Sequence, residues 1–108
     1  MNETTFEYDN EILSFVQSRY ISNNGLYIGL VCEDGEAYSD VSTNLDLNLP
    51  DNFICVRSDK MSAKHAMLFL EEKTIAEKTD LQFQSGFCCY DVYIINVKKL
   101  DKIATVMA

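Results

Sequence analysis

Two closely spaced Asx-Gly pairs constrain the fold of this chain more than any other feature. Asn24-Gly25 and Asp34-Gly35 lie in residues 19–44, RYISNNGLYIGLVCEDGEAYSDVSTN, among apolar, aromatic and β-branched residues. Asn, Asp and Gly tolerate the positive φ angles of tight hairpin turns, so these pairs are a strong short-range signal for β-hairpins. The segment is therefore predicted to form three antiparallel strands.

The second turn predicts a register. A two-residue Asp34-Gly35 loop places Leu30 opposite Ser39 and Val31 opposite Tyr38. Since successive side chains point to opposite faces of a strand, residues 26–32 are predicted to form a central strand covered on both faces. On the next strand, the side chains predicted to point to solvent are those of Glu36, Tyr38 and Asp40.

The first turn leaves its register open. A two-residue Asn24-Gly25 loop places Tyr20 opposite Gly29, where the ring would cover the glycine. A three-residue loop that also includes Asn23 places Tyr20 opposite Ile28. The two alternatives differ by one residue in the pairing of the first and second strands.

The segment before this turn, residues 12–21, fits both helical and strand spacing. We predict a strand, because the segment is rich in β-branched and aromatic residues and must lead into a hairpin. Asp9-Asn10 supplies a short turn through which residues 4–8 can pair back on it.

The rest of the chain predicts one principal helix and further strands. Ser62 is a good N-cap, and apolar residues at helical spacing predict a helix over residues 62–74 that lies across the sheet. Strands are predicted at residues 53–57, 81–87 and 88–97, with a loop at 45–52 and a bulge or bend at Gly86. Residues 98–108 are predicted to form a poorly ordered tail.

These elements predict a fold of the α+β class. The chain has 108 residues and 47% hydrophobic content, enough for one domain with its own core. We therefore expect a single α+β domain over residues 1–108, with an antiparallel β-meander packed with one principal helix and further strands C-terminal to it.

The negative charge is concentrated in one half of the chain. The net charge is -8; residues 1–51 contain ten acidic residues and one basic residue, and residues 52–108 contain seven acidic and eight basic residues. A negative field of this kind repels nucleic acid and anionic membranes and attracts basic protein surfaces. Ordinary solubility is the alternative explanation.

The four cysteines are expected to be reduced and structural. The sequence shows no secretory leader and no C-x-x-C pair, and Cys88 and Cys89 are adjacent and would point to opposite faces of a strand. No apolar run approaches the roughly 20 residues that span a bilayer. We therefore expect a cytoplasmic protein that binds neither membrane nor nucleic acid.

No catalytic, cofactor or metal site is predicted. His65 is the single histidine, and no motif ties a nucleophile to it. The cysteine spacing does not fit a zinc site, and the acids around Asp34 lack the EF-hand spacing. Gly-rich phosphate loops and basic-aromatic interleaving are missing. We therefore expect no cofactor, no metal and no enzymatic activity.

The chain resembles a family of small bacterial proteins, domain of unknown function 4313, which is found largely on phage, plasmid and conjugative elements of anaerobic bacteria. The resemblance is carried by residues 26–30 (LYIGL), 35–38 (GEAY), 43–45 (TNL) and 84–93 (QSGFCCYDVY). It implies a small α+β fold and a mobile-element setting. It implies no catalytic residue.

Two functions follow as hypotheses. The first is a small phage- or mobile-element-type protein that binds and inhibits or redirects a host protein with a basic surface, such as a nucleic-acid-handling defence enzyme, by acidic mimicry. The second is a structural module that self-associates through an edge strand, as in a homodimer, without catalysis. The partner-binding candidates are Glu33, Asp34, Glu36, Tyr38 and Asp40, with Tyr38 as the apolar anchor.

Overall fold

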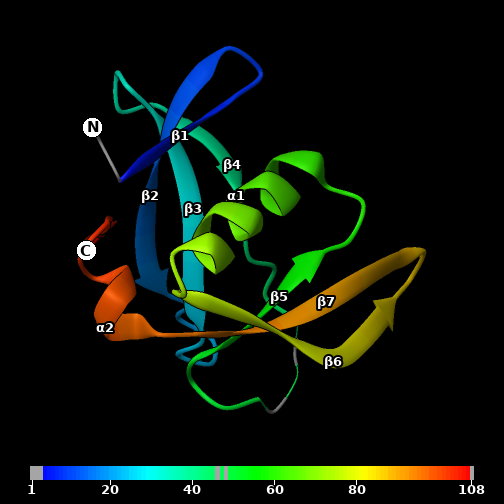
Figure 1. The fold of residues 1–108 in the computed structure, drawn as a ribbon. Coiled ribbons are helices and arrows are strands. Elements are labelled where there is room, and N and C mark those ends of the chain that lie inside the picture. The colour runs from blue at the N-terminus through cyan, green and yellow to red at the C-terminus, as the bar shows by residue number, and fades with distance from the viewer. Residues whose placement is uncertain (1–3, 46, 48, 108) are drawn as a thin grey trace.

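Two β-sheets and one principal helix make up the fold, seen in a computed structural model that describes residues 4–45, 47 and 49–107 (Figure 1). The helix, α1 (Met61–Glu72), contacts strands of both sheets. The predicted α+β class, with one principal helix and further strands after it, is confirmed.

The large sheet is a meander in the order β1-β2-β3-β4, with each neighbouring pair antiparallel. Its strands are β1 (Thr5–Tyr8), β2 (Glu11–Arg19), β3 (Leu26–Cys32) and β4 (Ala37–Asp40). The strand prediction for residues 12–21 is thus confirmed. The connection from β1 is the expected two-residue turn, in which Asp9 and Asn10 have φ angles of 52° and 64°.

The first Asx-Gly turn is longer than either predicted alternative. The Tyr20 N–H donates to the Gly25 carbonyl at 2.9 Å, so the loop contains the four residues 21–24. Asn24 alone has a positive φ there, and the Asn23 side chain accepts a hydrogen bond from the Gly25 N–H. The longer loop changes the register of β2 and β3. Gly29 lies opposite Val16 and Ile28 lies opposite Gln17, so both residues predicted to face Tyr20 are wrong.

The second Asx-Gly turn contains three residues, 33–35, because the Cys32 N–H donates to the Glu36 carbonyl and Gly35 has a φ of 90°. The predicted pairing of Leu30 with Ser39 is confirmed, but Val31 lies opposite Ala37. The extra residue is accommodated by a β-bulge at Tyr38. Tyr38 packs against the core, so its predicted outward orientation is wrong.

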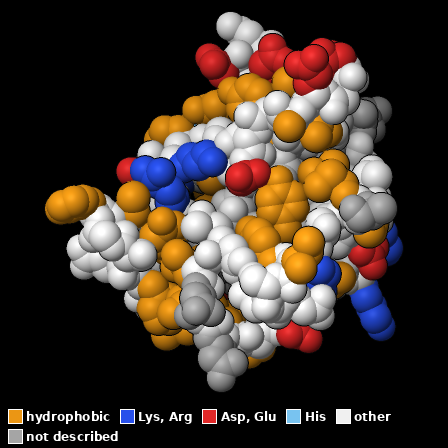
Figure 2. All heavy atoms as spheres, turned by 180° about the vertical axis from the view of Figure 1, so that it is seen from behind, with side chains coloured by type: hydrophobic (Ala, Val, Ile, Leu, Met, Phe, Trp, Pro, Cys, Tyr) orange, Lys and Arg blue, Asp and Glu red, His pale blue; other side chains and the backbone are white. Residues whose placement is uncertain are grey.

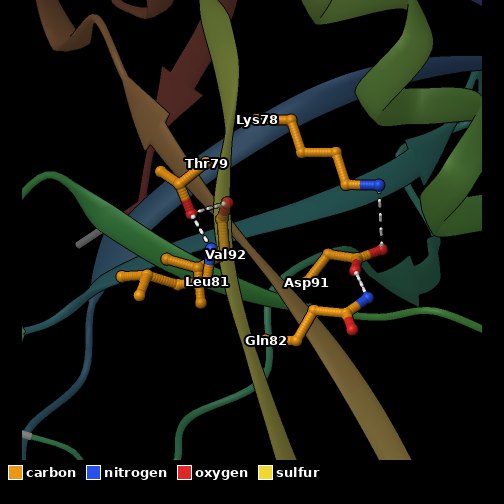
Figure 3. Close-up of polar contacts among 6 residues, drawn as sticks. All are labelled: Lys78, Thr79, Leu81, Gln82, Asp91 and Val92. Carbon is orange, nitrogen blue, oxygen red and sulfur yellow. Dashed lines mark hydrogen bonds and ion pairs between the residues drawn. The ribbon is translucent and has the colours of Figure 1, made fainter.

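The small sheet has the order β5-β7-β6. Its strands are β5 (Phe53–Arg57), β6 (Ala76–Ser85) and β7 (Cys88–Ile95). Gly86, with a φ of 62°, is in the two-residue turn between β6 and β7 and not in a bulge. The irregularity lies earlier, between Lys78 and Gln82, where the Thr79 hydroxyl donates to the Val92 carbonyl and accepts from the Leu81 N–H (Figure 3).

Helix α1 is shifted from its predicted bounds. Lys60 is the N-cap residue without a side-chain cap bond, and Ser62 is buried within the first turn. The helix ends before Thr74, which has a φ of 58° and donates its N–H to the Glu71 carbonyl, while the Ile75 N–H donates to Leu70. This pair of bonds is a Schellman motif with threonine in the left-handed position usually taken by glycine.

Two apolar clusters hold these layers together. The main core joins α1 to both sheets, and its largest fully buried side chains include Leu13, Phe15, Ile28, Leu30, Met67, Leu70 and Leu100. The second cluster lies under the loop after β4, where Leu45, Leu47 and Leu49 pack on Cys55, Tyr90 and Val92. Residues 46 and 48 of the predicted loop at 45–52 lie outside the described residues.

The C-terminal segment is not the poorly ordered tail that was predicted. It forms the short helix α2 (Val97–Leu100), capped by Asn96, and strand β8 (Ala104–Val106), which pairs parallel to β2. The buried Gln17 amide donates to the Asp101 carboxylate at 2.8 Å and to the Ala104 carbonyl. A long-range polar contact of this kind gives no local sequence signal.

All four cysteines are free thiols. Cys88 packs in the second cluster and Cys89 is exposed, so the two point to opposite faces of β7 as predicted. Among the helices of the described chain, none is long and apolar enough to cross a membrane.

Two leucines of α1 provide a matched test of this packing. Leu70 is 0% exposed and Leu68 is 57% exposed. Leu70→Ala is expected to lower the free energy of unfolding by about 2–5 kcal/mol, because it leaves a cavity in the main core. Leu68→Ala is expected to change it by less than about 0.5 kcal/mol. Urea unfolding monitored by circular dichroism measures both; equal effects would contradict the assigned helix face.

Candidate protein-binding site at the acidic end of the large sheet

The β1–β2 and β3–β4 turns lie at the same end of the large sheet, because each strand of a meander reverses direction (Figure 1). Six acidic residues from these turns and the adjoining strands form what we call the acidic end. Figure 2 shows acidic side chains gathered at this end of the molecule. The six are Glu7, Asp9, Glu11, Glu33, Asp34 and Glu36.

The carboxylates of the acidic end are exposed, and none of them forms an ion pair with a lysine or arginine among the described residues. The Asp34 carboxylate accepts a hydrogen bond from the Glu36 N–H at 3.0 Å, which holds the β3–β4 turn. Within the described chain, no three His, Cys, Asp or Glu residues are arranged to hold a metal ion. Within the described part of the chain, the acidic end is therefore a negative surface without a neutralising lysine or arginine.

Cys32 shows that the two turns act on one electrostatic site. Its thiol is partly buried at the end of β3, and burial raises its pKa above the ordinary value. A hydrogen bond to the Glu11 carboxylate and the negative charges of Asp34 and Glu36 raise this pKa further. Groups from β2 and from the β3–β4 turn thus act on the same thiol.

Tyr38 is near the acidic end but does not extend from it. Burial raises the pKa of its hydroxyl, and the neighbouring Asp9 and Glu11 carboxylates raise it further. Because of the bulge, the Tyr38 ring packs against the main core and does not project into solvent at the acidic end. It is not the exposed anchor that the sequence predicted.

Asp40 is separate from the other predicted site residues. It lies opposite Gly29 on the outer face of the large sheet and accepts a hydrogen bond from the Tyr27 hydroxyl at 2.6 Å. The Tyr27 ring covers Gly29 so closely that a Cβ there would overlap with it. Burial and the bond to Asp40 raise the pKa of Tyr27 above its ordinary range. Asp40 therefore has a local structural role.

The structure thus brings together three of the five predicted residues, Glu33, Asp34 and Glu36, and adds three that were not singled out, Glu7, Asp9 and Glu11. The Asp9-Asn10 turn was the available signal, since alternate turns of a meander share one end. Ile12, paired with Glu7, is 41% exposed and provides an apolar contact beside the carboxylates.

A cleft of about 190 Å³ lies at the opposite end of the sheet, between the β2–β3 turn and the loop before β5. Among the described residues of its lining, Asp51 is the one carboxylate and no histidine is present. Asp51 holds the loop through its carbonyl, which accepts a hydrogen bond from Arg19 at 3.0 Å.

Cys32 provides a probe of the acidic end. Glu11→Gln is expected to lower the pKa of the Cys32 thiol and to increase its rate of alkylation at pH 8, because a negative neighbour is removed. The exposed Cys89 is the internal control and should react at an unchanged rate. Iodoacetamide labelling with mass spectrometry of each thiol measures both rates; an unchanged Cys32 rate would contradict the assigned contact.

Comparison with known proteins gives a family and no activity. The family model described as "Domain of unknown function (DUF4313)" matches residues 13–106. No curated protein and no solved structure matches the chain. The match extends from Leu13 in β2 to Val106 in β8, so it includes α1, the small sheet and the large sheet without β1. The chain therefore belongs to the DUF4313 family.

Proposed function

We propose that this protein is a small binding protein that inserts its acidic end into a basic groove on another protein. The observation that carries the proposal is the convergence of six exposed, unpaired carboxylates from two turns that are distant in sequence. The backbone of the sheet end is already ordered before binding, so the entropy cost is limited to the rotamers of the carboxylate side chains. Such carboxylates are suited to a partner that supplies the missing positive charge.

The nature of the partner follows from this charge pattern. A groove with several lysines or arginines that is wide enough for two hairpin turns is typical of proteins that bind nucleic-acid backbones. In this proposal the acidic end mimics that backbone and blocks or redirects a nucleic-acid-handling host protein in the cytoplasm. The mobile-element setting implied by the resemblance fits such a role, in which the protein acts by occupancy and not by catalysis.

The expected energetics are electrostatic with a small apolar component. Each well-placed carboxylate contributes on the order of 1 kcal/mol and mainly increases the association rate, with strong dependence on salt. Ile12 supplies apolar contact area beside its cross-strand partner Glu7, in place of Tyr38. If charge provides most of the binding energy and Ile12 a smaller apolar part, salt should weaken binding and loss of Ile12 should accelerate dissociation.

Charge reversal at the acidic end tests the proposal. The variant Glu7→Lys, Glu33→Lys, Glu36→Lys leaves Asp9 and Asp34, which shape the two turns, unchanged. It is expected to weaken binding by at least about 100-fold and to reduce its salt dependence. The measurement is affinity capture from a bacterial lysate at low and high salt, followed by titration of the captured protein.

A control variant distinguishes the effect of charge at the acidic end from the effect of the protein's total net charge. Glu72→Lys, Glu77→Lys, Asp80→Lys changes the net charge by the same amount at three exposed residues of α1 and β6. This control should capture the same protein as the wild type. If the acidic-end variant also captures it with unchanged affinity, or if the wild type captures nothing at low salt, the proposal is wrong.

A further inference from the structure

The outer edge of β6 has no partner among the described residues. In the small sheet, β7 is central, and the outer edge of β5 receives a hydrogen bond from the Thr43 N–H to the Cys55 carbonyl at 2.8 Å. On β6, no corresponding bond is formed by the outward main-chain groups of residues 82–85. This strand therefore presents a free edge.

The register identifies the free main-chain groups. Ser85 and Cys88 close the two-residue turn and exchange hydrogen bonds, and these pairs alternate along antiparallel strands, so Phe83 is also bonded to β7. The N–H and C=O groups of Gln82 and Gln84 consequently point away from β7. Two donors and two acceptors are placed symmetrically about Phe83.

Charged residues and proline, two of the usual protections of an edge strand, are missing over this segment. Residues 81–90 contain no charged residue and no proline, in a chain whose net charge is -8. Leu81 is 46% exposed, and Phe87 at the tip of the hairpin is fully exposed. The apolar side chains and the free main chain thus lie on one uncharged edge.

Polar contacts keep this edge in an extended conformation up to the bulge. The side-chain amide of Gln82 donates to the buried Asp91 carboxylate at 2.7 Å, and the Lys78 ammonium lies 3.7 Å from the other oxygen of Asp91 (Figure 3). On the other side of the bulge, Thr79 satisfies the Leu81 N–H. The free edge is therefore preformed over residues 82–85 and ends at Leu81.

We propose that β6 pairs with β6 of a second copy of this chain, antiparallel and about a two-fold axis at Phe83. In this register Gln82 exchanges hydrogen bonds with Gln84 of the second copy, and the two Phe83 rings face each other across the axis. The closest side-chain approach in an antiparallel ladder occurs at such a non-hydrogen-bonded pair. The two small sheets then form one continuous sheet.

A second copy fits this edge better than an unrelated strand. The free groups are symmetric about Phe83, and an isologous contact requires this self-complementarity. Because residues 81–90 are uncharged, two copies meet without like charges opposite each other, although each is strongly acidic. The acidic end belongs to the other sheet and is left free, so this inference is independent of the proposed function.

The contact is short, so the dimer is expected to be weak. A few paired residues per copy with Leu81 and Phe87 at the margins bury less surface than a stable dimer interface. The dimer should form reversibly and only at high protein concentration. Since the contact contains no ion pair, salt should not dissociate it.

Amide hydrogen exchange by NMR at low and high protein concentration, with sedimentation to give the mass, tests the proposal. The main-chain N–H groups of Gln82 and Gln84 should exchange rapidly in the monomer and gain at least about tenfold protection as the dimer forms. The Phe83 and Ser85 amides, bonded to β7, are the internal controls and should be protected at both concentrations. A chain that remains monomeric, or a dimer in which Gln82 and Gln84 stay unprotected, would overturn the proposal.

A proline substitution provides the second arm. Gln84→Pro removes an outward N–H that the monomer does not use. Because both copies carry the substitution, each dimer loses two hydrogen bonds between the copies. The dissociation constant should rise at least about tenfold, whereas Gln84→Ala, which keeps the N–H, should leave it nearly unchanged. A Gln84→Pro variant that is folded and still dimerises like the wild type would refute the assigned edge; if this variant does not fold, the exchange experiment decides.

Discussion

The buried face of α1 is the contact on which the rest of the structure depends. Among the described residues, one isolated bridge links Thr43, which follows β4, to Cys55 of β5, and no continuous hydrogen-bonded ladder joins the two sheets. They are joined by apolar contact, in which Ala63, Ala66, Met67 and Leu70 pack in one core with side chains of both sheets. Small residues at two of these four positions let the sheets approach the helix closely.

The same core determines what remains at the surface. Because the bulge turns Tyr38 inward, the β3–β4 turn leaves its carboxylates exposed beside those of the β1–β2 turn. The core also closes over Leu100 and Ala104, which brings β8 beside β2. One edge of β2 is thus shared by β1 over Thr5–Tyr8 and by β8, so both ends of the described chain are held by the same strand.

The two surfaces proposed for binding depend on different forces. In the proposed function the acidic end acts through charge, which extends over about 10 Å at moderate salt and is screened at high salt. In the proposed dimer the β6 edge acts through main-chain hydrogen bonds and apolar contact, which are short-range and insensitive to salt. They belong to different sheets, so the binding of a basic partner and the pairing of two copies do not compete for the same residues.

The sequence by itself determined the fold class, the meander and the strand at β5, because Asx-Gly turns, alternation and helical spacing act over a few residues. It also placed Glu33, Asp34 and Glu36 at an exposed turn. Tertiary structure alone decided the two loop lengths, the bulge that buries Tyr38, and the return of β8 to Gln17. These features depend on whether a side chain finds space in the shared core and whether a distant polar group finds its partner, which no local pattern specifies.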